Sequence, residues 1–303
     1  QLQIEYGNKL TLKTESPVTK IRMDGKKSAR GVNFLNLKTG ALESMEAEDV
    51  IVCSGTIEST KLLLVSANQD WPDGIGNDSG HVGRHLMGHP VMFAFGVRPG
   101  NPDKIHQELG FDSLISRHFD SPEYQPKGKM WFSGSISLPS SLERQILSNV
   151  SRAYMNAKMI SEMAISLGGE MEQFEHTENR VSFGSGTTKH GLPTTKIEVG
   201  IHEINLKTQR EHVQTFVKIL KTAGCKEDSI ETGALNPDGA HASGTCRMSI
   251  SDADGVVNTN LQVHGTDNLY VCSNAVFPSI AAANPTLTLG ALAIRLSEYI
   301  SKK

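Results

Sequence analysis

The chain lacks a strong net charge and closely spaced cysteines. Its 303 residues carry a formal charge of -3 at pH 7. A chain so close to neutrality has no field that would draw it to nucleic acid or an acidic membrane, so we expect neither partner. Its four cysteines (Cys53, Cys225, Cys246 and Cys272) are too far apart in sequence for a metal knuckle or a Cys-x-x-Cys pair. We therefore expect free thiols, and the cysteines do not fix a compartment.

Long apolar runs and common catalytic motifs are also scarce. The most apolar stretch, residues 275–294, contains Pro278, Asn284 and Pro285, which are unusual together in a membrane span. It predicts a buried loop that leads into a helix. The sequence contains no P-loop, Gly-x-Ser-x-Gly elbow or His-Glu-x-x-His motif. The segments "GIGNDSG" and "GSGTTKHG" follow no buried strand, so they predict turns rather than a dinucleotide site.

What is present predicts a globular chain of two lobes, since 38% of the residues are hydrophobic and 21% charged. Residues 9–55 alternate apolar and polar side chains and predict strands, and "DVIVCSG" predicts a buried central strand. "TIESTKLLLVSAN" predicts a helix packed on that strand. These elements form a first segment, residues 1–94.

A second segment, residues 95–234, has a different pattern. It predicts further strands and two helices, over residues 141–167 and 205–224, the latter capped by Gly224. Residues 235–303 then return to loops, a short strand and a terminal helix. We expect this third segment to complete the first lobe, with a ligand crevice between the two lobes.

Two polar residues of the third segment are candidates for chemistry. His241 lies in "GAHASGTCRMS", which predicts a tight turn, and an imidazole accepts protons near neutral pH. The alternative for His241 is a hydrogen-bonded core residue. Asn284 precedes Pro285 and could cap the terminal helix or hydrogen-bond an alcohol oxygen, and the two roles are compatible. Three further histidines (His81, His85 and His89) are four residues apart, but the neighbouring glycines argue against a helix, so we expect no metal there.

Four segments together resemble the glucose–methanol–choline (GMC) family of FAD-dependent alcohol oxidoreductases. They are "DVIVCSGTIESTKLLLVSAN", "GHVGRHLMGHP", "ENRVSFGSGTTKHGLPTTKIEVGI" and the block from "HASGTCRM" through "ANPTLTLG". The motif "ENRVSFGSGTTKHGLPTTKIEVGI" is similar to the sugar-oxidising branch of the family, which includes pyranose oxidase and sugar dehydrogenases. The resemblance implies part of a Rossmann-like FAD domain, plus a substrate domain with a mostly antiparallel sheet flanked by helices.

The resemblance also implies roles for individual residues. His241 would take the hydroxyl proton of a sugar or polyol as hydride passes to flavin N5, and Asn284 would bind the same oxygen. The FAD contacts implied are Ser54, Gly55, Thr56, Ser273, Asn274, Pro285 and Thr286. Ser273 stands where the family usually has an acid, and His85, Gly88 and Ser249 also depart from its pattern. Oxygen, a quinone or a cytochrome would reoxidise the flavin.

The family's Gly-x-Gly-x-x-Gly segment for the FAD pyrophosphate is absent from these residues. We therefore expect an N-terminal FAD-binding portion or a partner subunit to supply it, and weak FAD binding by residues 1–303 alone. The alternative is a protein of the same fold without redox activity, either a lyase that uses His241 as a base or a binding subunit.

Overall fold

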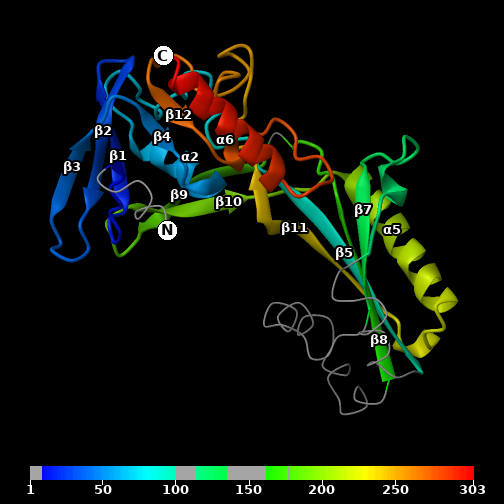
Figure 1. The fold of residues 1–303 in the computed structure, drawn as a ribbon. Coiled ribbons are helices and arrows are strands. Elements are labelled where there is room, and N and C mark those ends of the chain that lie inside the picture. Colours follow the sequence, from blue (N-terminus) through cyan, green and yellow to red (C-terminus); the bar gives the residue numbers. More distant parts are fainter. Residues whose placement is uncertain (1–8, 100–113, 135–161, 177) are drawn as a thin grey trace.

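The computed structural model describes residues 9–99, 114–134, 162–176 and 178–303, which form two lobes, each with its own hydrophobic core (Figure 1). The fold is mixed α/β with mostly antiparallel sheets, which confirms the predicted fold class. Among the described residues, no helix is both long and apolar enough to cross a membrane.

The first lobe combines an antiparallel sheet with a short parallel one. The antiparallel sheet has the order β1 (Val18–Asp24), β2 (Ser28–Leu35) and β3 (Leu42–Glu46). The parallel pair joins β4 (Val50–Val52) to β12 (Leu269–Val271), so the first and third segments of the chain share one sheet. Helices α2 (Gly55–Val65) and α6 (Thr286–Ile300) contribute to this core, together with the 3-10 turn η6 (Asn274–Val276). The pairing of β4 with β12 thus joins the first and third segments of the chain within one lobe.

The second lobe is a five-stranded antiparallel sheet. Its order is β11 (Glu231–Ser243), β5 (Met87–Pro99), β8 (Glu162–Met171), β7 (Gly128–Gly134) and β6 (Leu114–Ser116). Helix α5 (Glu203–Thr222) packs along this sheet, and Phe216 and Leu220 are fully buried in the core between them. Two short 3-10 turns belong to this lobe: η2 (His118–Asp120) packs beside β7, with Phe119 in the core, and η5 (Glu227–Ser229) lies beside β5. The hairpin of β9 (Arg180–Thr187) and β10 (Pro193–Glu198) lies beside α2.

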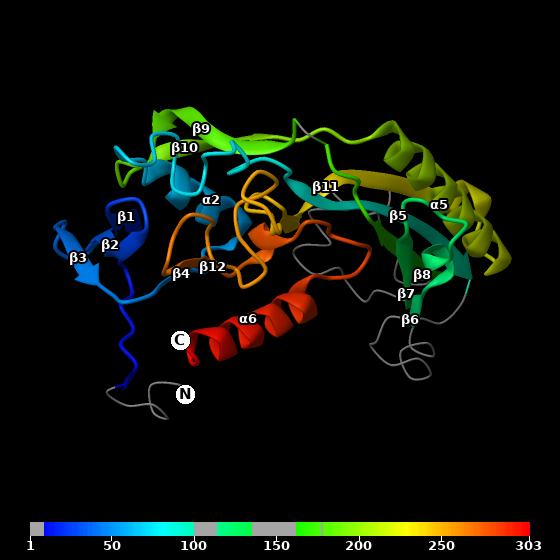
Figure 2. The same cartoon turned by 90° about the horizontal axis from the view of Figure 1, so that it is seen from above.

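Two long strands connect the lobes. β5 and β11 each have 13 residues and run antiparallel from the first lobe into the second (Figure 2). Both strands pass through the expected segment boundaries near residues 94 and 234. Side chains near the first-lobe ends of β5 and β11 therefore lie where both lobes meet.

Several local predictions were wrong because strand pairing decides the structure of ambiguous segments. Residues 162–167 were expected to be helical but belong to β8, which pairs with β5 on one side and β7 on the other. The remainder of that expected helix, residues 141–161, lies outside the described residues. Residues 9–14 form no strand, and Leu12 is 66% exposed there. The expected turn at His241 is the end of β11 instead, and the chain turns at Gly244.

Candidate functional site

The two residues that the sequence singled out, His241 and Asn284, are in contact. His241 lies near the end of β11 and is half-buried, and Asn284 lies two residues before α6. The amide nitrogen Nδ2 of Asn284 is 3.2 Å from Nε2 of His241. An imidazole and a carboxamide that are 43 positions apart in sequence thus meet at one point at the junction of the two lobes.

A lysine of the second lobe approaches the same amide from its other side. Lys129 lies on β7, and its ammonium donates a hydrogen bond to Oδ1 of Asn284. The ammonium also lies 3.0 Å from Oε2 of Glu170 on β8. Lys129 and Glu170 are register partners across the β7–β8 pair, the arrangement in which opposite charges stabilise a sheet.

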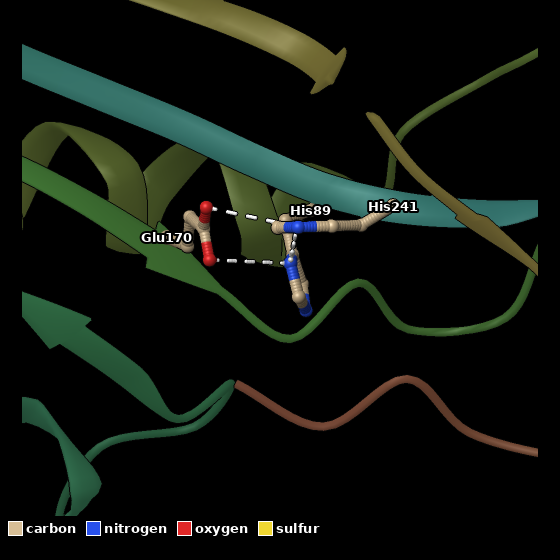
Figure 3. A group of neighbouring side chains, drawn as sticks. All are labelled: His89, Glu170 and His241. Carbon is tan, nitrogen blue, oxygen red and sulfur yellow. Dashed lines mark hydrogen bonds and ion pairs between the residues drawn. The ribbon is translucent and has the colours of Figure 1, made fainter. Parts of the chain in front are cut away.

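Glu170 in turn faces two histidines, as Figure 3 shows. Its carboxylate lies 3.3 Å from Nδ1 of His89 and 3.7 Å from Nδ1 of His241. The two Nδ1 atoms are 2.9 Å apart. His89 projects from β5 and is fully buried, so this cluster brings together side chains from three neighbouring strands, β11, β5 and β8.

The charge state of Glu170 follows from its partners. Burial by itself would raise the pKa of this carboxyl, but hydrogen bonds and positive charge from Lys129 and from a protonated His89 outweigh it and lower the pKa to about 2. Glu170 is therefore an anion throughout the neutral range. It places a fixed negative charge beside both imidazoles.

Backbone contacts fix the end of β11 against α2 and η6. The hydroxyl of Thr56 donates to the carbonyl of Ala242 at 2.5 Å, and the hydroxyl of Thr245 donates to the carbonyl of Thr56 at 3.0 Å. The amide of Gly244 donates to the carbonyl of Asn274. Gly244 has φ +96°, and a Cβ there would lie 2.2 Å from the carbonyl oxygen of His85, so only glycine fits.

The residues that the sequence predicts as cofactor contacts lie close to the end of β11 that carries His241. Ser54, Gly55 and Thr56 form the start of α2, where Ser54 is exposed, and α2 has no side-chain cap. Gly55 has φ +74°, and a Cβ there would meet nothing within 4 Å, so the space in front of this helix start is open. Uncapped amides at a helix N-terminus favour anionic groups.

The other predicted cofactor residues lie at η6 and at the start of α6. Ser273 is buried, and its hydroxyl accepts from the amide of Ala275. Oδ1 of Asn274 is buried and has no hydrogen-bond partner among the described residues. Pro285 is buried and Thr286 is exposed at the start of α6, which also has no side-chain cap. The orphaned amide oxygen and two uncapped helix starts fit a polar, anionic cofactor such as a flavin nucleotide.

The three regularly spaced histidines do not form one site. His81 and His85 contact each other, with Nδ1 and Nε2 2.7 Å apart, whereas His89 faces His241. His85 has φ +61°, which excludes the helix that would align all three. It also pairs with Glu175, which Arg247 holds at 3.0 Å. Burial lowers the pKa of His85 more than the charge of Glu175 raises it.

A different group has the geometry of metal ligands. One ligand atom from each of His89, Glu170 and His241 lies within 4.8 Å of the others. The ammonium of Lys129 already places a positive charge 3.0 Å from this carboxylate, which disfavours a second cation there. We therefore interpret the group as a hydrogen-bonded charge cluster.

Sequence reasoning missed the contributions of Lys129 and Glu170 and the pairing of His89 with His241. The available signal was an isolated charge within each of two apolar strand patterns, "GKMWF" and "SLGGEM". Because strand register sets which side chains face each other, that signal alone could not place the two charges together.

Comparison with known proteins gives consistent relatives over most of the chain. Two family models, both described as GMC oxidoreductase, match residues 2–91 and 175–293. The chain is 27% identical to 2-methyl-1,2-propanediol dehydrogenase of Mycolicibacterium austroafricanum, over 96% of this chain and 54% of that protein. It is 26% identical to 6'''-hydroxyparomomycin C oxidase of Streptomyces lividus, over 96% of this chain and 51% of that protein. The chain thus spans about half the length of these curated relatives.

The structural comparison agrees with the sequence comparison. Pyridoxine 4-oxidase from Mesorbium loti superposes with a TM-score of 0.67 at 20% identity, covering 98% of this chain and 59% of that one. At this identity the likeness establishes the shared fold.

Proposed function

The chain belongs to the GMC oxidoreductase family, and we propose that it carries the proton-accepting half of an FAD-dependent oxidation of an alcohol or sugar hydroxyl. The observation that carries this proposal is the contact of His241 with Asn284, 3.2 Å apart at the junction of the lobes. A site that binds and deprotonates a hydroxyl group needs a base and a hydrogen-bond donor close together, and this contact supplies both.

In this proposal His241 accepts the hydroxyl proton at Nε2. The amide of Asn284 donates a hydrogen bond to the substrate oxygen, which gains negative charge as its proton leaves. Lys129 orients this amide, and Glu170 stabilises positive charge on the imidazole. FAD, when bound, would accept the hydride from the carbon that carries the hydroxyl.

Residues of two helix starts and of η6 would hold the cofactor. We assign the contacts to Ser54, Gly55 and Thr56 on one side and to Ser273, Asn274, Pro285 and Thr286 on the other. The hydroxyl of Thr56 is already bonded to Ala242, so Thr56 would contribute its backbone amide. The buried and unpaired Oδ1 of Asn274 would gain the donor that it lacks among the described residues.

The proposed substrate is a small molecule with several hydroxyl groups. Two relatives are named for oxidising 2-methyl-1,2-propanediol and 6'''-hydroxyparomomycin C, both of which carry hydroxyl groups. The polar donors around His241 suit such a substrate better than a purely apolar alcohol, because hydroxyl groups that leave water need new partners.

The test uses the FAD-loaded protein, assembled with its FAD-binding portion, without oxygen. Sugars, diols and aminoglycosides are added one at a time, and the flavin absorbance band is followed. We expect at least one polyol to bleach the band and to yield a carbonyl product. If ligands bind but none bleaches the flavin, the protein is a binder or a lyase and the proposal is wrong.

A further inference from the structure

Hydrogen-bond polarity in the cluster can be assigned link by link, starting from a group that only donates. The ammonium of Lys129 can only donate hydrogen bonds, so the atom of Asn284 that it contacts must be the carbonyl oxygen Oδ1. The NH₂ group of Asn284 then necessarily points toward His241. A lysine from the second lobe therefore fixes the orientation of the amide.

The orientation of this amide determines the tautomer of His241. The NH₂ group of Asn284 can only donate, and it lies 3.2 Å from Nε2 of His241. Nε2 must therefore offer its lone pair. A neutral His241 then carries its single proton on Nδ1. The lone pair on Nε2, which here accepts from Asn284, is the base that a substrate hydroxyl would reach by taking the place of the amide.

The same logic extends to His89. Nδ1 of His241 lies 2.9 Å from Nδ1 of His89, so His241 donates and His89 accepts. A neutral His89 must then carry its proton on Nε2, which lies 3.2 Å from the carbonyl oxygen of Ala281. Since a carbonyl can only accept, this last link also agrees, and the chain runs in one direction from Lys129 to Ala281.

One contact in this resting arrangement is mismatched. Nδ1 of His89, an acceptor in this tautomer, lies 3.3 Å from the Oε2 carboxylate atom of Glu170, which can also only accept. A second proton on His89 would turn this contact into a charge-assisted hydrogen bond. The charged or titratable groups that face His89 among the described residues are Glu170 on β8, His241 on β11 and, beyond Glu170, Lys129 on β7.

We propose that His89 is the second proton acceptor in a two-histidine proton relay. When the substrate O–H bond breaks, a new N–H bond forms at Nε2 of His241. The Nδ1–H bond of His241 then breaks, and a new bond forms at Nδ1 of His89. The positive charge thus moves into a fully buried position against Glu170, and His241 is neutral again.

This inference rests on the proposed role of His241 as the base. His89 acts through His241 and does not touch the substrate, so it is a positioning residue. Its function is to take the positive charge from His241, so that the accepted proton on Nε2 belongs to a neutral imidazole and does not return to the substrate oxygen before the carbonyl forms. The carboxylate of Glu170, which the ammonium of Lys129 pairs at 3.0 Å, supplies the negative charge that holds the proton there.

The first measurement needs no cofactor. Nitrogen-15 NMR of the histidine-labelled chain distinguishes protonated from unprotonated ring nitrogens at neutral pH. We expect the proton of His241 on Nδ1 and that of His89 on Nε2. Observing His241 protonated at Nε2 overturns the relay, and so does stoichiometric uptake of added Zn²⁺ that His89→Gln abolishes, since the cluster would then be a metal site.

The second measurement compares His89→Gln with His212→Gln in the FAD-loaded protein. His212 is also a fully buried histidine of the second lobe, but it stacks on Phe119, with ring centroids 3.6 Å apart. We expect His89→Gln to slow flavin reduction about tenfold. The pH at which that rate is half-maximal should also fall. In mixtures of H₂O and D₂O, the wild-type rate should vary with the deuterium fraction along a curve, as expected for two moving protons, whereas the rate of His89→Gln should vary along a straight line. His212→Gln should leave the pH profile and the isotope dependence unchanged.

The outcomes separate the relay from the proposed function. If His241→Ala keeps the wild-type rate of flavin reduction, His241 is not the base and the proposed function fails. If His241→Ala loses the rate while His89→Gln keeps the wild-type pH profile and isotope dependence, the function stands and the relay is wrong. Loss of rate in His89→Gln without a change in either profile assigns His89 a purely structural role and also overturns the relay.

Discussion

The ammonium of Lys129 lies 3.0 Å from the carboxylate of Glu170, directly across the β7–β8 pair in which the two residues are register partners. This pair links the sheet of the second lobe to the amide of Asn284 and to both histidines of the site. The site is therefore built from both lobes, and its polarity depends on charges in the second lobe.

Lys129→Met tests the importance of this pair for stability. The substitution leaves the buried carboxylate of Glu170 without its ammonium partner, which typically costs about 3 kcal/mol. We expect a loss of that size in urea unfolding at neutral pH. The control is Lys196→Met, which removes an exposed ion pair with Glu198 and should cost no more than about 1 kcal/mol. Equal effects of the two substitutions would show that the Lys129 pair contributes no more than a surface contact.

Acid should weaken the fold through Glu170. Its pKa is lowered in the folded state from 4.5 to about 2, so the unfolded chain binds more protons between these values. The contribution is fully present above pH 4.5 and is lost as the pH falls toward 2, by about 2 kcal/mol after solvent screening. Glu170→Gln should flatten this part of the stability curve in urea unfolding at pH 5, 4 and 3. An unchanged pH slope in Glu170→Gln would contradict the assignment.

Residues 1–303 on their own should bind FAD weakly. The sequence offers helix starts and the Asn274 amide, but no Gly-x-Gly-x-x-Gly loop to bind the pyrophosphate. Calorimetric titration of the purified chain with FAD is therefore expected to show weak binding, and co-expression with a polypeptide that carries such a loop should strengthen it. A yellow chain with one FAD per molecule after dialysis would refute this expectation.

Residues 1–303 taken alone should self-associate through helix α6. Leu287 is 87% exposed and Ile294 is 65% exposed, and their spacing of seven residues places them on one face of the helix. We expect concentration-dependent association in sedimentation experiments, and the double variant Leu287→Lys with Ile294→Lys should be monomeric. Ile250→Lys is the control, because Ile250 is 95% exposed but lies outside α6. A monomeric wild-type chain would contradict the prediction.

The sequence predicted the elements that carry strong local signals. The starts of α2 and α6 and the glycine turn after α5 depend on short-range chemistry, and the structure places them as expected. The strand at residues 50–52 also forms, but it is not the buried central strand that was expected: within the described residues it pairs only with β12, and Ile51 is 45% exposed. Asn284 and His241 could be paired only through the family resemblance, because 43 residues separate them. Their contact is now observed, whereas their catalytic roles stay predictions.

What the sequence could not predict depends on pairing between distant strands. Residues 162–167 have a helical apolar spacing but lie between β5 and β7, where hydrogen bonds to both neighbours decide their conformation. The same register brings Glu170 opposite Lys129 and beside His89. No local pattern specifies that register, so the polar network around His241 could be found only in three dimensions.

The central claim is that His241 accepts the proton of a substrate hydroxyl, and single-turnover flavin reduction by His241→Ala tests it most directly. With an alcohol that bleaches the wild-type flavin, we expect the variant's rate to fall by a factor of about 10² to 10⁴, which is the usual contribution of a general base. Substrate binding should change little. A variant that reduces the flavin as fast as the wild type would contradict the account.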